Sequence, residues 1–315
     1  MITAIAGGVG AARLLRGLVQ VLPPAEITAV VNTGDDTELH GLHISPDLDT
    51  VTYTLAGRND EERGWGLAGE TWTVMDTLAD LGGESWFRLG DRDLATHLYR
   101  TQRISEGAPL SEVTTELSRQ LGTGIEVLPM SDDPVHTRLE LAADGREVAF
   151  QEYFVRLRHD EPVNAVHFEG ADTAAPAPGV TAAIESAEVV VICPSNPVVS
   201  IGPILAVPEV SPAVAARRDT VVAISPIVAG KALKGPADRL LLELGEEPSV
   251  LGVARRYVEV CGTLVIDEAD AGYADTVRSL GMRCVVAPTV MRTATDAAVL
   301  GKVVLDAGRP PAGRR

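Results

Sequence analysis

The sequence predicts an α/β protein with a Rossmann-like, mostly parallel sheet and helices on both of its faces. Short apolar runs alternate with stretches in which apolar residues recur at helical spacing. Apolar residues make up 45% of the chain and aromatic residues only 4%, with many Val, Ala and Leu. This composition is typical of a parallel sheet buried between helices rather than of a β sandwich.

The N-terminal elements predict one β-α-β unit. The apolar run 2–6 is expected to be a strand that ends in a glycine-rich turn. Leucines and valines then recur at helical spacing over 14–22, and the prolines at 23 and 24 stop that helix. The next apolar run, 27–31, is expected to be the second strand. Such units have parallel strands and a right-handed crossover.

The rest of the chain continues this alternation with one interruption. Later strands are expected at 189–193, 221–224, 264–266 and 284–287, and helices at 211–218, 237–244 and 270–280. In the middle, 136–141 alternates with period two, Asp144 and Gly145 signal a hairpin turn, and 147–154 returns as a strand. We therefore expect one domain over 1–315, with an inserted helical and β-hairpin subdomain at roughly 71–160. Residues 309–315 are expected to be a frayed tail.

Charge and cysteine content exclude several classes of partner. A net charge of −17 argues against nucleic acid or an anionic membrane as the main partner. An anionic substrate would need help from a metal, helix ends or a few arginines. Three widely spaced cysteines and the lack of a membrane-length apolar run or basic leader predict a cytoplasmic protein without disulfides. A homodimer is the default expectation.

The segment 31–53 is the strongest candidate for a site. We expect it to be loop-like, and it follows the second strand directly. It carries four carboxylates and two histidines: Asp35, Asp36, Asp47, Asp49, His40 and His43. Loops at the carboxyl ends of parallel strands form the ligand crevice, and oxygen ligands there suit magnesium or a base that acts on a hydroxyl. The alternative is that these residues only build turns. Zinc is not expected, because no third nitrogen or thiolate is evident.

Two further strand ends carry polar groups that could hold a phosphate. Gly8 and Gly10 follow the first strand and open a helix, where free backbone N–H groups can meet an anion. The alternative is a tight turn, and a P-loop is excluded because no Gly-Lys-Ser/Thr follows. Ser195 and Asn196 follow the strand at 189–193, where they offer polar donors, and the alternative is that Ser195 or Ser200 simply caps the next helix.

Cations and tryptophans complete the candidates. The run 88–93 begins with Arg88 and, with His97 and Arg100, offers cations to an anionic ligand. The alternative is that the Arg and Asp residues of this run only form solvated ion pairs on the face of a helix. The three tryptophans could line the pocket of a planar ligand, although packing in the core is the better expectation for each one: Trp65, Trp72 and Trp86.

Taken in order, these stretches resemble the 2-phospho-L-lactate transferase family (CofD, called FbiA in actinobacteria), which acts in the biosynthesis of coenzyme F420. The matching stretches run from the first strand to about residue 237. They are GGVGAARLLRGL, VNTGDD, HGLHISPDLDTVTYTLAG, RGWGLAGETW, LGDRDLATHLYRT, LPMSDDPVHT, FQEYFVR, PSNPVVSIGPIL and SPIVAGKALKGPA. Beyond residue 237 the likeness is weaker and rests mainly on the helix and strand pattern.

The resemblance implies a magnesium-dependent enzyme with a Rossmann-like sheet and an inserted subdomain. It would transfer a phosphoenolpyruvyl or 2-phospho-L-lactyl group from a guanosine diphospho-conjugate to the ribityl hydroxyl of the deazaflavin Fo, releasing GMP. It assigns Fo binding to Asp49 and Arg88, and the metal to Asp35 with Asp49 nearby. Both carboxylates are then catalytic, and Asp49 is expected to orient or deprotonate the hydroxyl. The guanosine phosphates are assigned to the glycine turn and the next strand end: Gly8, Gly10, Ser195 and Asn196.

Two other classes of function are weighed against this one. One is a non-catalytic, nucleotide-sugar-binding regulator of the related gluconeogenesis-factor family, which the stretches LGDRDLATH, SDDPV and FQEYF disfavour. The other is an NAD-dependent oxidoreductase, which predicts an acid at the tip of the second strand, where Asn32 stands. The donor's enolpyruvate or lactate is not distinguished by the sequence, with a weak preference for enolpyruvate.

Overall fold

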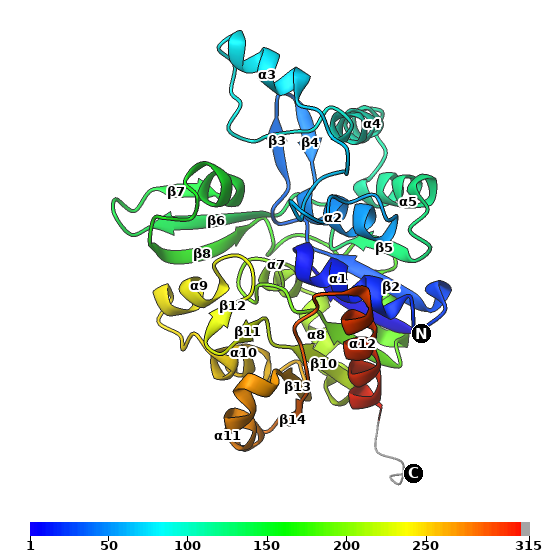
Figure 1. Ribbon diagram of the computed structural model, residues 1–315, viewed down its shortest axis with the longest axis vertical. Coiled ribbons are helices and arrows are strands. Elements are labelled where there is room, and N and C mark those ends of the chain that lie inside the picture. Colours follow the sequence, from blue (N-terminus) through cyan, green and yellow to red (C-terminus); the bar gives the residue numbers. More distant parts are fainter. Residues whose placement is uncertain (310–315) are drawn as a thin grey trace.

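The computed structural model describes residues 1–309 and contains a central sheet of seven parallel strands (Figure 1). The strand order is β14-β13-β10-β9-β1-β2-β5. The strands are β1 (Ile2–Ala6), β2 (Ile27–Val31), β5 (Glu126–Pro129), β9 (Val189–Ile192), β10 (Val221–Ile224), β13 (Thr263–Ile266) and β14 (Arg283–Val286). Every residue of β1, β9, β10 and β13 is buried, which explains why these strands are continuous apolar runs in the sequence. The predicted fold class is confirmed.

Helices cover both faces of this sheet, and successive strand residues point to opposite cores. Ile5 and Val30 belong to one core, whereas Ala4 and Val31 belong to the other. The second core holds α1 (Gly8–Leu18) and α12 (Ala294–Gly308), which pack against each other. The first core holds α6 (Val180–Ser186), α7 (Gly202–Ala206), α8 (Val210–Ala216), α9 (Ala237–Glu243), α10 (Val250–Tyr257) and α11 (Ala274–Ser279).

The segment after β2 is folded, which corrects the expectation of a loop. A hairpin of β3 (Thr37–Leu39) and β4 (Leu42–Ile44) is followed by α2 (Pro46–Leu55). His40 and Gly41 form the hairpin tip with φ values of 56° and 73°. This left-handed conformation is the one that a tight two-residue hairpin turn requires. Asp47 and Asp49 therefore lie in the first turn of a helix, with buried side chains.

The middle of the chain forms the upper part of the molecule in Figure 1. It contains α3 (Thr73–Asp80), α4 (Asp93–Ser105) and α5 (Leu110–Leu121). A separate antiparallel sheet has the order β7-β6-β8, from β6 (His136–Leu141), β7 (Glu147–Ala149) and β8 (Val163–Glu169). The strand expected over 147–154 ends at Ala149, and a π-helix, Glu152–Arg156, follows. Strands β5 and β8 were not predicted. Strand β5 lies within the range 71–160 that was expected to form the inserted subdomain, yet it pairs with β2 and belongs to the central sheet.

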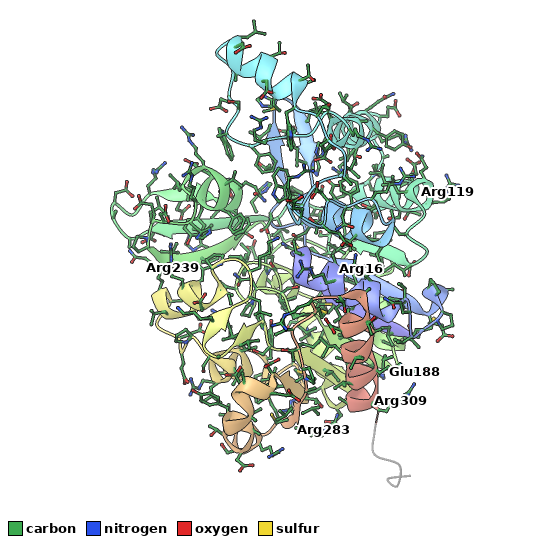
Figure 2. All side chains as sticks on the ribbon, in the orientation of Figure 1. Arg16, Arg119, Glu188, Arg239, Arg283 and Arg309 are labelled. Atoms are coloured by element: carbon green, nitrogen blue, oxygen red, sulfur yellow. The ribbon has the colours of Figure 1, made fainter. Side chains whose placement is uncertain are left out.

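Smaller elements complete the described chain. They are the hairpin of β11 (Ile227–Val228) and β12 (Lys231–Ala232), and the 3-10 turns Pro24–Glu26, Arg218–Thr220 and Glu268–Tyr273. Most of the tail predicted to fray, 310–315, lies outside the described residues. Charged side chains such as Arg119 and Glu188 lie at the periphery (Figure 2). All three cysteines are free, as expected. Within residues 1–309, no helix combines the length and apolar character that crossing a bilayer requires.

Candidate active site

The site lies where the order of the central strands reverses. From β1 the chain moves outward to β2 and β5, and it then returns to β9 on the other side of β1. In open parallel sheets this switch point forms the ligand crevice. A cavity of about 940 Å³ lies here, and segments from the whole length of the chain line it. Its lining includes all the residues predicted for the site: Gly8, Gly10, Asp35, Asp49, Arg88, Ser195 and Asn196.

The glycine turn after β1 is shaped by close contact with the loop after β9. A Cβ atom at Gly10 would lie 2.2 Å from the carbonyl oxygen of Pro194, so only glycine fits there. Ser195 Oγ donates a hydrogen bond to the Gly7 carbonyl at 2.6 Å and accepts one from the Gly7 N–H at 3.3 Å. Helix α1 begins at Gly8 with no side-chain cap and no acidic residue in its first turn. The Asp47 carboxylate lies against this N-terminus and accepts a hydrogen bond from the Gly8 backbone, so the N–H groups that follow Gly8 are the ones suited to bind a further anion.

Ser195 and Asn196 hold the two loops in shape, but neither caps the next helix, α7, which begins without a side-chain cap. The Ser195 hydroxyl is engaged by Gly7, as described above. The Asn196 side-chain oxygen accepts a hydrogen bond from the Val198 N–H at 2.9 Å. Both residues still line the cavity, so any contact with a ligand would involve their remaining polar atoms.

Three carboxylates gather beyond the end of β2. Asn32 Nδ2 donates to Asp47 Oδ2 at 3.0 Å, and Ser45 Oγ donates to Asp36 Oδ2 at 2.6 Å. Asp36 Oδ2 also lies 3.1 Å from His43 Nε2. Asp35 Oδ1 is buried and has no hydrogen-bond partner within the described residues. A buried carboxylate oxygen without a partner is costly, so this atom calls for a ligand.

Burial changes the protonation of these groups. Burial, and then the nearby charge of Asp47, hold the pKa of Asp35 well above its ordinary value. Burial raises the pKa of Asp47 to about 7, against the opposing hydrogen bond from Asn32. A divalent cation would offset the cost of burying these two carboxylates as charged groups, because it favours the ionised form of both. Asp35 and Asp47 offer the oxygen ligands that magnesium prefers, so these residues fit such an ion.

Asp49 lies in a different environment. Arg100 holds its carboxylate through both guanidinium nitrogens, with Nη1 3.2 Å from Oδ2. His97 Nδ1 lies 3.8 Å from the same oxygen, and His97 Nε2 lies 3.3 Å from Asp93 Oδ2. Tyr53 donates a hydrogen bond of 2.5 Å to Asp93 Oδ1. These side chains are all buried, so this part of the run after Arg88 is not a set of solvated pairs.

This network bears on the expected metal role of Asp49. By spacing alone, Asp49, Asp93 and His97 could hold an ion. The guanidinium of Arg100, however, already neutralises Asp49 and would repel a cation there. Burial raises the pKa of Asp49, while the charges of Arg100 and His97 oppose that rise. The geometry therefore favours an oriented base over a metal ligand at this position.

Arg88 lies on the cavity wall among aromatic side chains. Its guanidinium carbon is 5.0 Å from the centre of the Trp72 ring, and Nη2 is 2.9 Å from Asp76 Oδ1. Trp65 and Trp86 also line the cavity, which agrees with the planar-ligand alternative for these two. Trp65 is 43% exposed, so its expected packing in the core is wrong.

The sequence analysis missed the contribution of the π-helix. Phe150, Gln151 and Phe154 all line the cavity, and Gln151 Nε2 donates to the Asp35 carbonyl at 3.1 Å. A strand would have sent Phe150 and Gln151 to opposite faces. The available signal was the cluster of aromatic residues in FQEYF, which breaks the period of two. Wide helical turns of this type are frequent at functional sites.

Comparisons with known proteins identify relatives of this chain. Curated proteins named phosphoenolpyruvate transferase are similar over most of the chain. That of Streptomyces griseus is 47% identical over 97% of both chains, and that of Streptomyces coelicolor is 48% identical over 92% of both. The crystal structure of a UPF0052 family protein from Bacillus halodurans is 19% identical, with a TM-score of 0.60. It covers 96% of this chain and 98% of its own, and it supports the fold alone.

The family itself is identified over nearly the whole chain. The family model described as 2-phospho-L-lactate transferase CofD matches residues 2–288. Together with the curated relatives, this match favours an enzyme over a non-catalytic regulator, and a transferase over an oxidoreductase. The chain belongs to the 2-phospho-L-lactate transferase family (CofD) and is an enzyme of the phosphotransferase class.

Proposed function

We propose that the enzyme transfers a phosphoenolpyruvyl group, or a 2-phospho-L-lactyl group, from a guanosine diphospho-conjugate to the ribityl hydroxyl of Fo. The reaction releases GMP and forms a precursor of coenzyme F420. The names of the relatives, at 42–48% identity, support enolpyruvate as the transferred group. The observation that carries the proposal is that one cavity brings the N-terminus of α1, buried carboxylates and aromatic walls together.

The acceptor half of the cavity is assigned to Asp49, Arg88 and Trp86. Asp49 orients the ribityl hydroxyl and accepts its proton, and Arg100 fixes the direction of the carboxylate. A hydroxyl is a weak nucleophile, so positioning and proton removal supply much of the rate. Arg88 and Trp86 offer a forked donor and an aromatic surface to the planar, polar deazaflavin.

The donor half is assigned to the glycine turn and to the acidic cluster. Backbone N–H groups from Gly8 to Gly10 face the phosphates, and Asp35 with Asp47 would hold magnesium. When bound, magnesium neutralises charge on the diphosphate oxygens. The hydroxyl oxygen forms a bond to the phosphorus that carries the enolpyruvyl group. The bond from that phosphorus to the bridging oxygen breaks, and GMP leaves with the electron pair.

The test is a mass-spectrometric assay of the purified protein with Fo, magnesium and each donor in separate reactions. We expect the mass of the enolpyruvyl phosphodiester of Fo, formed together with one equivalent of GMP. Faster turnover of the lactyl donor would assign that group instead. Binding of the nucleotide without any product from either donor would contradict the transferase and support a regulator.

A further inference from the structure

Three cationic side chains of the cavity lining, Arg13, Lys234 and Arg292, form no ion pair within residues 1–309, and two of them, Arg13 and Lys234, influence each other. Arg13 projects from α1, and Lys234 lies in the loop after β12; both are exposed and both line the cavity. Their neighbours in sequence behave differently, because Arg16 pairs with Glu61 and Lys231 lies 3.3 Å from Asp238. Within residues 1–309, neither Arg13 nor Lys234 has a carboxylate oxygen within 4 Å. Lys234 Nζ has only a long contact, 3.5 Å, with the Gly64 carbonyl.

The two cations also lie close enough to affect each other. Partial loss of water around Lys234, and then the charge of Arg13, lower the pKa of this lysine. Two like charges held together without a counter-ion are unfavourable. Carboxylates are abundant in a chain with a net charge of −17, so a missing partner here is informative. The arrangement becomes favourable when an anion lies between the two side chains.

The position of Arg13 indicates which anion this is. Arg13 extends from the same helix whose N-terminus, from Gly8 to Gly10, lines the cavity. An arginine fork and a lysine point charge are the usual partners of phosphate oxygens. A simple alternative is that both side chains are only hydrated, which their exposure permits.

We propose that Arg13 and Lys234 together bind the diphosphate of the nucleotide donor. This inference rests on the proposed function, since it names the residues that would hold the donor. Lys234 leaves its long contact with Gly64 when the anion binds, and the phosphates then lie between the two side chains.

Calorimetric titration with GDP and with inorganic pyrophosphate, each with magnesium, tests this inference. We expect Arg13→Gln and Lys234→Gln each to weaken binding of both probes by about tenfold or more, which is typical of losing one charge-assisted hydrogen bond. Lys234→Arg keeps the charge and should recover most of the affinity. The matched control is Lys231→Gln in the adjacent strand β12, whose side chain is 82% exposed and lies against Asp238; it should bind like wild type.

Two further measurements separate the possible outcomes. Affinity of the wild type should fall with added salt, and Lys234→Gln should show a weaker fall, because one fewer charge pair is screened. Unchanged affinity of both Gln variants for both probes, with normal melting temperatures, would overturn the inference and leave the proposed function intact. Lost affinity in the variants, together with no turnover of Fo by the wild type, would support the anion site and reject the proposed function.

Discussion

At the scale of single residues, the surroundings of each acid decide its chemistry. Asp49 is buried but neutralised by Arg100, so it is held in one orientation. Asp35 is equally buried, yet one of its oxygens lacks any partner among the described residues. Asp47 accepts a hydrogen bond from Asn32 and has a raised pKa of about 7. One short segment thus holds the carboxylates that we propose as an oriented base and as oxygen ligands for a cation.

Replacing Asp35 or Asp49 by Asn should reduce turnover by about a hundredfold or more, because each carboxylate acts on charge in the transition state. The two variants should differ in stability. Asp49→Asn leaves Arg100 buried without its counter-ion and should cost about 3–5 kcal/mol, whereas Asp35→Asn should not. Turnover at saturating magnesium and urea unfolding measure the two effects. Near-normal turnover of either variant would remove that residue from the site.

The pKa of Asp47 predicts how pH affects the metal-free protein. The pKa is about 7 in the folded protein and near ~4 in the unfolded chain, so the folded state holds the proton more tightly. Its contribution to stability is complete below pH ~4 and is lost as the pH rises toward about 7. In EDTA, Asp47→Asn should therefore gain stability relative to wild type between pH 4.5 and pH 8, by up to about 4 kcal/mol. Urea unfolding at both pH values measures this difference, and a constant difference would contradict the prediction.

Arg88→Lys keeps the charge but removes the planar fork that faces the cavity. We expect the KM for Fo to rise clearly more than the KM for the guanosine donor. Asp76→Asn is the matched control, since it removes the ion pair of Arg88 at 2.9 Å and leaves the cavity wall intact. Steady-state kinetics with each substrate varied separately give both constants. An Fo KM equal to that of wild type would reduce Arg88 to a surface ion pair.

At the scale of elements, the start of α1 depends on the loop after β9. Gly10 lies directly against Pro194, and Ser195 binds both backbone groups of Gly7. The helix N-terminus is therefore positioned by a segment that is distant in sequence. If the loop after β9 shifted by a few tenths of an ångström relative to the glycine turn, the N–H groups that face the cavity would move with it.

Gly10→Ala tests this dependence. Its Cβ would meet the Pro194 carbonyl at 2.2 Å, which the backbone can relieve only by moving. We expect a loss of about 1–3 kcal/mol in stability, as in other overpacked sites, together with weaker binding of GDP. Gly272→Ala is the control, because a Cβ there meets nothing within 4 Å. Calorimetric binding and thermal melting report both effects, and a variant that matches Gly272→Ala in both would contradict the prediction.

At the scale of the whole molecule, an acidic protein concentrates a few cations around one cavity. The net charge of −17 repels a diphosphate at long range. The cavity counters this with the N-terminus of α1 and with cationic side chains on its wall, namely Arg13, Arg88, Lys234 and Arg292. We propose that the buried carboxylates in the same cavity bind a cation of their own before a polyanion binds beside them.

Activity should therefore require a divalent cation. Exhaustive EDTA treatment should abolish turnover, and magnesium or manganese should restore it, because the available ligands are oxygens. Zinc should be unnecessary, since the described residues show no thiolate cluster. The measurement is Fo turnover by the dialysed enzyme with each metal added back. Full activity after EDTA treatment would contradict this prediction.

The sequence by itself determined the parallel sheet and the position of the crevice. Buried runs such as 27–31 and the glycine turn at Gly8 and Gly10 are local signals, because burial on both faces and backbone sterics act on neighbouring residues. The sequence also places the acidic segment after the second strand at this crevice, because the loops at the carboxyl ends of parallel strands meet at one edge of the sheet.

Only the tertiary structure decided how these groups divide their roles. The pairing of Asp49 with Arg100, 51 residues apart, depends on how α4 packs against β4 and α5, and no local pattern encodes this packing. The edge strand β5 and the π-helix at 152–156 were likewise missed, because their conformations are selected by neighbours distant in the chain. The effect of the Arg13 charge on Lys234 also arises only in the folded protein, because the two residues are distant in the sequence and folding brings them to the same cavity.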